Sequence, residues 1–175
     1  MNSTLVFADK TVRRSYTYTL LSTVEFESNE SLERYERFKK KLLSACAEGT
    51  DSDVQSNRRR EQEILRRWLF EGKIIDNCAI CGNDFSKDSL VAAHKKPRSE
   101  CSFNERVDPY VVMPLCKFGC DYLYEIGLIR VCGGTVVSSI SGDITDYEKK
   151  LVEKLDGNKL DACWVKGRVD YFLKT

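Results

Sequence analysis

The sequence has no long apolar run, only one histidine and no excess of either charge. The chain has 175 residues, and its 28 Lys and Arg nearly balance its 27 Asp and Glu, for a formal net charge of +1. This balance excludes a globally basic protein that coats nucleic acid, although local basic clusters can still bind phosphate. No apolar run approaches the roughly 20 residues that a membrane-spanning helix needs. We therefore expect a soluble protein that does not contact a membrane.

The N-terminal segment has no basic start followed by a long apolar stretch, so it is not typical of a signal peptide. We therefore expect a cytoplasmic protein. Eight cysteines are many for such a protein, because a reducing compartment disfavours a disulfide scaffold. Cysteines that are paired closely in sequence favour metal binding there.

Four of the cysteines form two close pairs. Cys78 and Cys81 are separated by two residues, as in a zinc knuckle. Cys116 and Cys120 are separated by one residue more, and Gly119 can absorb the extra residue. Four thiolates complete a tetrahedral shell with no open position, so the pairs predict a structural zinc site. Four free thiols in a core are the alternative interpretation.

A thiol oxidoreductase that uses Cys78 and Cys81 is a third interpretation of the first pair. It requires a thioredoxin-like βαβ pattern around the two cysteines, and the sequence does not show one. The other four cysteines are scattered along the chain, and we expect ordinary thiols there. These are Cys46, Cys101, Cys132 and Cys163.

His94 is the single histidine, and its sequence context favours a chemical role. It follows a short apolar run at 90–93 that is typical of a strand, and it precedes a basic segment. A neutral imidazole at the end of a strand can take a proton from a water molecule beside a phosphodiester. Basic side chains around it would hold the phosphate backbone. The candidate backbone-binding residues are Lys95, Lys96, Arg98 and Arg106.

Two carboxylates follow the second cysteine pair. Asp121 and Glu125 are four residues apart, so they share one face if this segment is a helix. Carboxylate oxygens suit Mg²⁺ or Mn²⁺, and such a cation can stabilise a scissile phosphate and its leaving oxygen. The alternative is a solvated acidic pair on an amphipathic helix. A role in cation binding is better supported for Asp121 than for Glu125.

Periodicity gives a coarse map of the chain. An N-terminal region at 1–72 contains strands and helices and would serve in DNA binding, in dimerisation or as scaffold. A central region at 73–132 carries the motifs. A C-terminal region at 133–175 forms a hairpin and a helix that pack against the central region. We expect strands at 4–8, 16–26, 128–132 and 135–140, and helices at 31–47, 52–70 and 145–156. In the last helix we expect Tyr147, Leu151 and Leu155 to lie on one face.

Together the central segments resemble the HNH endonuclease family, most closely its branch of bacterial restriction endonucleases. The resemblance spans residues 75–132. The segments that carry it are Cys78-Ala-Ile-Cys81, Leu90-Val-Ala-Ala-His94-Lys-Lys-Pro97, Glu105-Arg-Val-Asp-Pro109, Met113-Pro-Leu-Cys116-Lys-Phe-Gly-Cys120-Asp121 and Leu123-Tyr-Glu-Ile-Gly-Leu-Ile129.

The resemblance implies an α+β fold with a ββα-metal core, in which a two-stranded ribbon and a loop precede a helix. It implies that His94 is the general base and that Asp121, directly after the last zinc cysteine, binds the catalytic cation. The sequence departs from the family at two positions. The motif asparagine would fall near Tyr110 or Val111, and the metal-binding residue often found before the histidine is Ala93.

The resemblance predicts an endonuclease that hydrolyses phosphodiester bonds in double-stranded DNA, with a structural Zn²⁺ and a catalytic Mg²⁺ or Mn²⁺, in restriction or phage defence. Cutting both strands at a palindrome would need two active sites, which a homodimer supplies. The missing asparagine favours the alternative, a zinc-stabilised nucleic-acid-binding or interaction module with a degenerate nuclease site.

Overall fold

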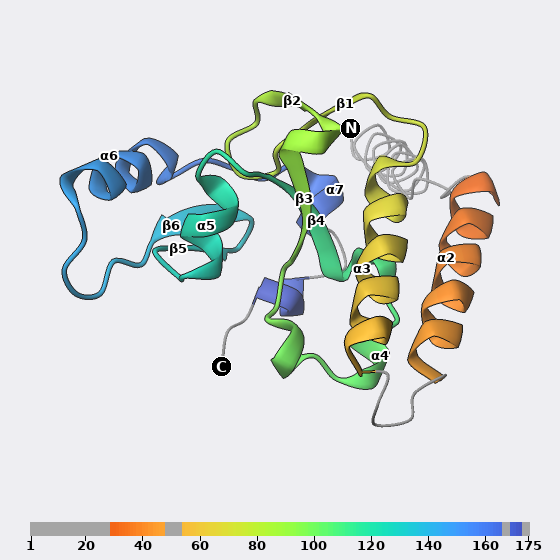
Figure 1. Ribbon diagram of the computed structural model, residues 1–175. Coiled ribbons are helices and arrows are strands. Elements are labelled where there is room, and N and C mark those ends of the chain that lie inside the picture. Colours follow the sequence, from red (N-terminus) through yellow and green to blue (C-terminus); the bar gives the residue numbers. More distant parts are fainter. Residues whose placement is uncertain (1–28, 48–53, 166–168, 173–175) are drawn as a thin grey trace, which may run out of the picture. The chain divides into compact units, whose positions relative to one another are not determined.

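A computed structural model describes residues 29–47, 54–165 and 169–172 (Figure 1). These segments form a mixture of helices and three separate two-stranded antiparallel sheets, which is an α+β arrangement. Within these segments, no helix is both long enough and apolar enough to cross a bilayer.

The chain divides into two compact units, residues 1–35 and residues 36–175. Of the first unit, the structure describes only the start of helix α2 (Asn29–Ala47). The strands expected at 4–8 and 16–26 lie outside the described residues. The second unit contains all the candidate site residues.

Helix α3 (Val54–Phe70) packs against the part of α2 that belongs to the second unit. The rings of Phe38 and Trp68 meet edge to face with their centroids 5.5 Å apart, and Leu42 and Leu65 are fully buried. The two helices confirm those predicted from the three- and four-residue spacing of apolar side chains.

Two hairpins and a short helix follow α3. Strands β1 (Ile75–Asn77) and β2 (Asp84–Ser86) form the first hairpin, and β3 (Leu90–His94) pairs with β4 (Val112–Cys116) to form the second. In this register, His94 lies opposite Val112 at the open end of the pair. Helix α5 (Cys120–Glu125) begins four residues after β4 ends. The chain therefore runs strand, connection, strand, helix across the region that contains His94 and Asp121.

Short helical turns lie on both sides of β3, in the connections from β2 and to β4. These are η2 (Lys87–Ser89), η3 (Arg98–Glu100), α4 (Phe103–Arg106) and η4 (Pro109–Val111). A capping box between Ser102 and Glu105 starts α4, since each side chain bonds the other's backbone N–H.

The C-terminal part contains the predicted hairpin and helix. Strands β5 (Ile129–Cys132) and β6 (Thr135–Ser138) pair across the Gly-Gly turn, and α6 (Asp146–Leu155) follows. The turns α7 (Ala162–Val165) and η5 (Val169–Phe172) end the described chain. Both predictions are confirmed.

Tyr147, Leu151 and Leu155 share one face of α6, as expected, but this face is not buried along its whole width. Val152 and Leu155 are buried and Leu151 is half-buried, but Tyr147 is 71% exposed. At 100° per residue, Tyr147 lies about 110° around the helix from the centre of the buried stripe. Steps of four residues from Tyr147 to Leu155 therefore lead from an exposed position to the buried stripe.

Candidate functional site

The first cysteine pair lies in the turn between β1 and β2. The backbone N–H of Cys78 donates to the Asn83 carbonyl at 3.0 Å, and that of Gly82 donates to the Cys78 carbonyl at 2.9 Å. Gly82 adopts φ +71°, a conformation that side chains with a Cβ rarely take. The turn has the tight geometry that a knuckle needs.

The second pair connects β4 to α5. Cys116 is the last residue of β4, and Cys120 is the first of α5. Gly119 precedes Cys120 with φ +135°, so the longer spacing is accommodated by a backbone conformation that favours glycine. The N–H of Cys116 donates to the Cys78 sulfur at 3.4 Å, which joins the two pairs.

The four thiols form one cluster, in which the sulfur atoms all lie within 4.8 Å of one another. Cys78, Cys116 and Cys120 are buried and Cys81 is half-buried. Hydrogen bonds from Cys120 and Cys78 lower the pKa of Cys116 to about 2, whereas the hydrogen bond with Cys116 raises the pKa of Cys78 to about 12. A second thiolate is disfavoured beside the first unless a cation lies between them.

This cluster can hold a metal ion, and its donor set is compatible with structural zinc. The prediction that the two pairs meet is confirmed. The cluster connects the β1–β2 turn to the β4–α5 junction. The cluster positions His94 indirectly, because β3, which ends at His94, pairs with β4, which ends at Cys116.

A cavity of about 450 Å³ lies beside the open end of β3 and against α5. We call it the His94 cavity. Its lining comes from α3, β3, the loop after β3 and α5, and consists of Gln62, Val91, Ala92, Ala93, His94, Pro97, Arg98, Asp121, Tyr124 and Glu125. The structure therefore brings the predicted base and both predicted carboxylates to one cavity.

Asp121 and Glu125 form the acidic side of this cavity. They lie one turn apart on α5, as the sequence spacing predicts for a helix. Burial and the charge of Glu125 both raise the pKa of Asp121. Two carboxylates that repel one another at the edge of a cavity are a suitable pair of oxygen donors for a hard divalent cation.

His94 is largely buried in the wall of the cavity. Its side chain is 14% exposed, and its Nε2 atom has no hydrogen-bond partner in the described part of the chain. Burial lowers the pKa of His94, while the nearby Glu61 carboxylate raises it and Arg98 lowers it. The lowered pKa keeps the imidazole neutral at pH 7, as a proton acceptor must be.

Glu61 on α3 is a functional candidate that sequence reasoning missed. It is almost fully buried, and its carboxylate accepts two hydrogen bonds from Arg98, at 2.9 Å from Nε and 2.7 Å from the terminal nitrogen. One of its oxygens lies 3.9 Å from Nε2 of His94. Its spacing from Leu65 and Trp68 on the apolar stripe of α3 is the signal that could have identified it.

Other side chains of α3 support β3 directly. Gln62 donates to the Ala92 carbonyl at 3.0 Å, and Arg66 donates to the Leu90 carbonyl at 2.6 Å. Among the strands that the structure describes, β3 pairs with β4 alone, so carbonyls on its other edge need donors from elsewhere. α3 supplies these donors and fixes the strand that ends at His94.

The predicted backbone-binding cations need a correction. Lys95 is buried, and its ammonium donates to the Trp164 carbonyl at 2.8 Å and lies over the Phe172 ring. An ammonium held in this way is not presented to a phosphate, so Lys95 is a core cation. Alternation along the strand explains the error, because Lys95 continues β3 on the face opposite His94.

Two of the other three cations have internal partners. Lys96 pairs with Glu105 at 3.0 Å, and Arg98 is held by Glu61 although it still lines the cavity. The Nε atom of Arg106 is buried without a hydrogen-bond partner among the residues that the structure describes. Of the predicted set, Arg98 is the one that the structure places at the His94 cavity.

The buried Glu61–Arg98 pair predicts that two glutamates of α3 contribute very differently to the stability of the fold. Glu61→Ala is expected to destabilise the fold by on the order of 3 kcal/mol, because it leaves the Arg98 charge without its partner. Glu63→Ala breaks an exposed pair with Arg67 on the same helix and should cost about 0.5 kcal/mol or less. Urea denaturation of both variants measures the difference. Equal losses would contradict the assignment of Glu61 as a buried structural partner.

Comparison of this chain with models of known protein families found no match. A search of curated proteins also found no match. The functional argument therefore depends on the geometry of the site.

Proposed function

We propose that β3, β4 and α5 form a ββα-metal core of the HNH type, and that the protein is a metal-dependent endonuclease acting on DNA. The observation that carries the proposal is that His94, Asp121 and Glu125 line one cavity. A proton acceptor beside two oxygen donors is the arrangement that hydrolysis of a phosphodiester requires.

In the proposed reaction, His94 is the general base. Its neutral imidazole accepts a proton from a water molecule, and the water oxygen forms a bond to phosphorus as the bond to the leaving oxygen breaks. The buried carboxylate of Glu61 then faces the imidazolium that forms and stabilises its charge. Arg98, held in place by Glu61, presents positive charge to the phosphate from the cavity wall.

Asp121 and Glu125 are the residues that would hold the catalytic Mg²⁺ or Mn²⁺. Such a cation, when bound, supplies charge neutralisation at the phosphate and at the leaving oxygen. Asp121 follows Cys120 directly, so the cysteine cluster fixes the backbone that carries this carboxylate.

A second candidate is a zinc-stabilised binding module with a degenerate nuclease site. The observations that favour it are Ala93, which has no metal-binding atom in its side chain, and the internal pairing of Lys96 and Arg98. This candidate predicts nucleic-acid binding without cleavage under any divalent cation.

Cleavage assays separate the two candidates. The native protein is expected to nick supercoiled plasmid with Mg²⁺ or Mn²⁺ and to be inactive in EDTA. Asp121→Asn should lower the rate by about a hundredfold or more, since it removes about 3 kcal/mol of cation-mediated stabilisation. Asp143→Asn removes an exposed carboxylate that does not line the cavity, and it should leave the rate unchanged. Absence of nicking with both cations would remove the nuclease proposal and leave the binding module.

A further inference from the structure

Positive charge is concentrated on two helices of a nearly neutral chain. Within the second unit, the described residues of α2 and α3 (36–47 and 54–70) contain nine Lys and Arg against three Asp and Glu. The rest of the sequence contains 19 Lys and Arg against 24 Asp and Glu. The helical pair therefore carries a local positive field that the overall charge conceals.

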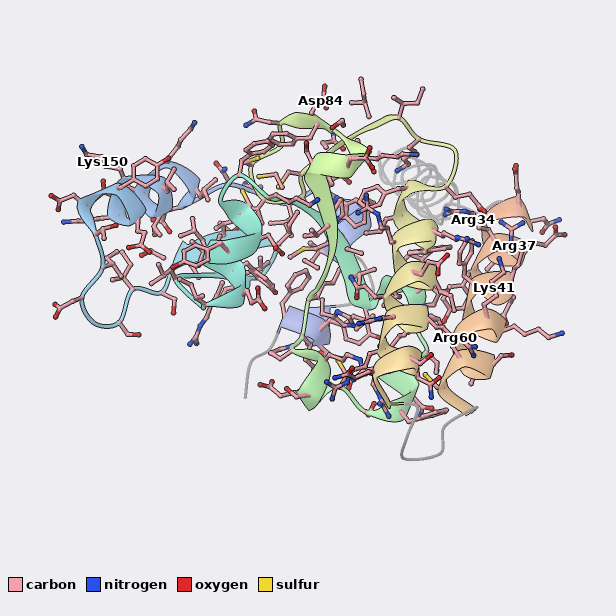
Figure 2. The ribbon with its side chains drawn as sticks, in the orientation of Figure 1. Arg34, Arg37, Lys41, Arg60, Asp84 and Lys150 are labelled. Carbon is pink, nitrogen blue, oxygen red and sulfur yellow. The ribbon has the colours of Figure 1, made fainter. Side chains whose placement is uncertain are left out.

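A groove of about 340 Å³ lies between these two helices. Lys41 from α2 and Arg60 and Arg67 from α3 line it, and we call it the basic groove. Its apolar lining includes Phe38, and the Lys41 ammonium lies 4.8 Å from the centre of that ring. Figure 2 labels Lys41 and Arg60, whose side chains extend from the two helices.

Cations outnumber carboxylates among the described residues that line the basic groove. Arg67 pairs with Glu63 at 2.7 Å, and of the described residues that line the groove, Glu63 is the one that is acidic. Lys41 and Arg60 are both exposed, so they can meet a ligand from solvent. Ser44 adds a hydroxyl at the groove. Lys, Arg and Ser side chains are those that commonly contact phosphate oxygens in protein–DNA interfaces.

Helix α3 connects the basic groove to the His94 cavity. Gln62 lines the cavity, whereas Arg60 and Arg67 line the groove on another face of the same helix. A protein partner fits this surface poorly, because the cores of protein interfaces are depleted of charged residues, whereas four charged side chains line this groove. A polyanion would have to cross α3 to reach both places, because Gln62 lies about 140° to 160° around the helix from the two arginines.

We infer that the basic groove binds the phosphate backbone of duplex DNA next to the phosphodiester that occupies the His94 cavity. This inference rests on the proposed function for its second half, while binding at the groove itself can be measured without cleavage. The groove would give affinity and register without reading sequence, because it presents charge and a hydroxyl rather than base-specific contacts.

Fluorescence anisotropy with a labelled DNA duplex in EDTA tests the inference. The double variant Lys41→Gln, Arg60→Gln is expected to weaken binding by roughly tenfold per removed contact at about 50 mM salt and to reduce the slope of log affinity against log salt by about two. The matched control is Lys149→Gln, Lys150→Gln, which removes two exposed cations from α6 and should bind as the native protein does.

A third variant distinguishes an effect of lost charge on DNA binding from an effect of impaired folding. The pair Lys41→Arg, Arg60→Lys preserves both charges and is expected to bind duplex with native affinity, with thermal melting of all variants followed in parallel. Three results overturn the inference: equal affinity of the Gln variant and the native protein, an equal loss of affinity in the α6 control, and an absence of duplex binding.

Two further results separate the inference from the proposed function. Duplex binding that depends on the groove, without any cleavage, overturns the nuclease proposal alone. Cleavage that is insensitive to the groove variant overturns this inference alone.

Discussion

Cys120→Ser is expected to abolish metal binding and to destabilise the protein by on the order of 5 kcal/mol or more, which is comparable to the whole stability of many small domains. The native protein should contain one zinc ion per chain. The physical reason is that the cluster joins the β1–β2 turn to the β4–α5 junction, and β1 and β2 are only three residues long each. A pair of strands this short has little core of its own to stabilise it. Mass spectrometry of bound metal and thermal unfolding with and without a chelator measure both effects.

The chain offers matched controls for this variant. Cys132 and Cys163 are exposed and lie outside the cluster, so their serine variants should retain full zinc content and native stability. A Cys120→Ser protein that melts as the native protein does would contradict a structural metal. So would native protein that carries no zinc after purification without chelators.

His94→Ala is expected to lower the rate of plasmid nicking by about 10² to 10⁴-fold, the range that a lost general base typically costs. His94 is the only histidine, so no second imidazole can replace it. The variant should still bind duplex DNA, because the basic groove lies on another face of α3. Nicking assays alongside anisotropy separate a lost base from lost binding. Native-like nicking by His94→Ala would contradict the assigned role.

The pH dependence of nicking has a predicted direction. Burial is the largest influence on His94 and lowers its pKa below the usual value of about 6.5, although the Glu61 carboxylate opposes the shift. A general base acts in its neutral form, so the rate should rise with pH and level off once the imidazole is neutral. Because the pKa is lowered, the midpoint of this rise should lie below pH 6.5. Glu61→Gln should move the midpoint further down, since it removes the charge that stabilises the imidazolium.

Much of the candidate site follows from short-range sequence pattern. The two cysteine pairs, the strand before His94 and the helical spacing of Asp121 and Glu125 are each encoded within a few residues. Such features depend on local backbone geometry, which a sequence reports directly.

The roles of α3 and of Lys95 could not be predicted in the same way. Arg66 of α3 donates to the carbonyl of Leu90 in β3, which lies 24 residues later in the sequence. Glu61 lies 33 residues before His94 in the sequence yet 3.9 Å away in space. Lys95 reads as part of an exposed basic loop, yet it is buried against Trp164, 69 residues later.

By itself, the sequence determined which atoms can hold a metal and which imidazole is available, because ligand type and close spacing fix that chemistry. Tertiary structure decided which charges face the His94 cavity and which are used to hold the fold together. The physical reason is that a charged side chain meets whichever partner the packing of distant segments provides, and burying a charge without a partner is costly. The partners of Glu61, Arg98 and Lys95 come from distant segments and are therefore set by the tertiary structure.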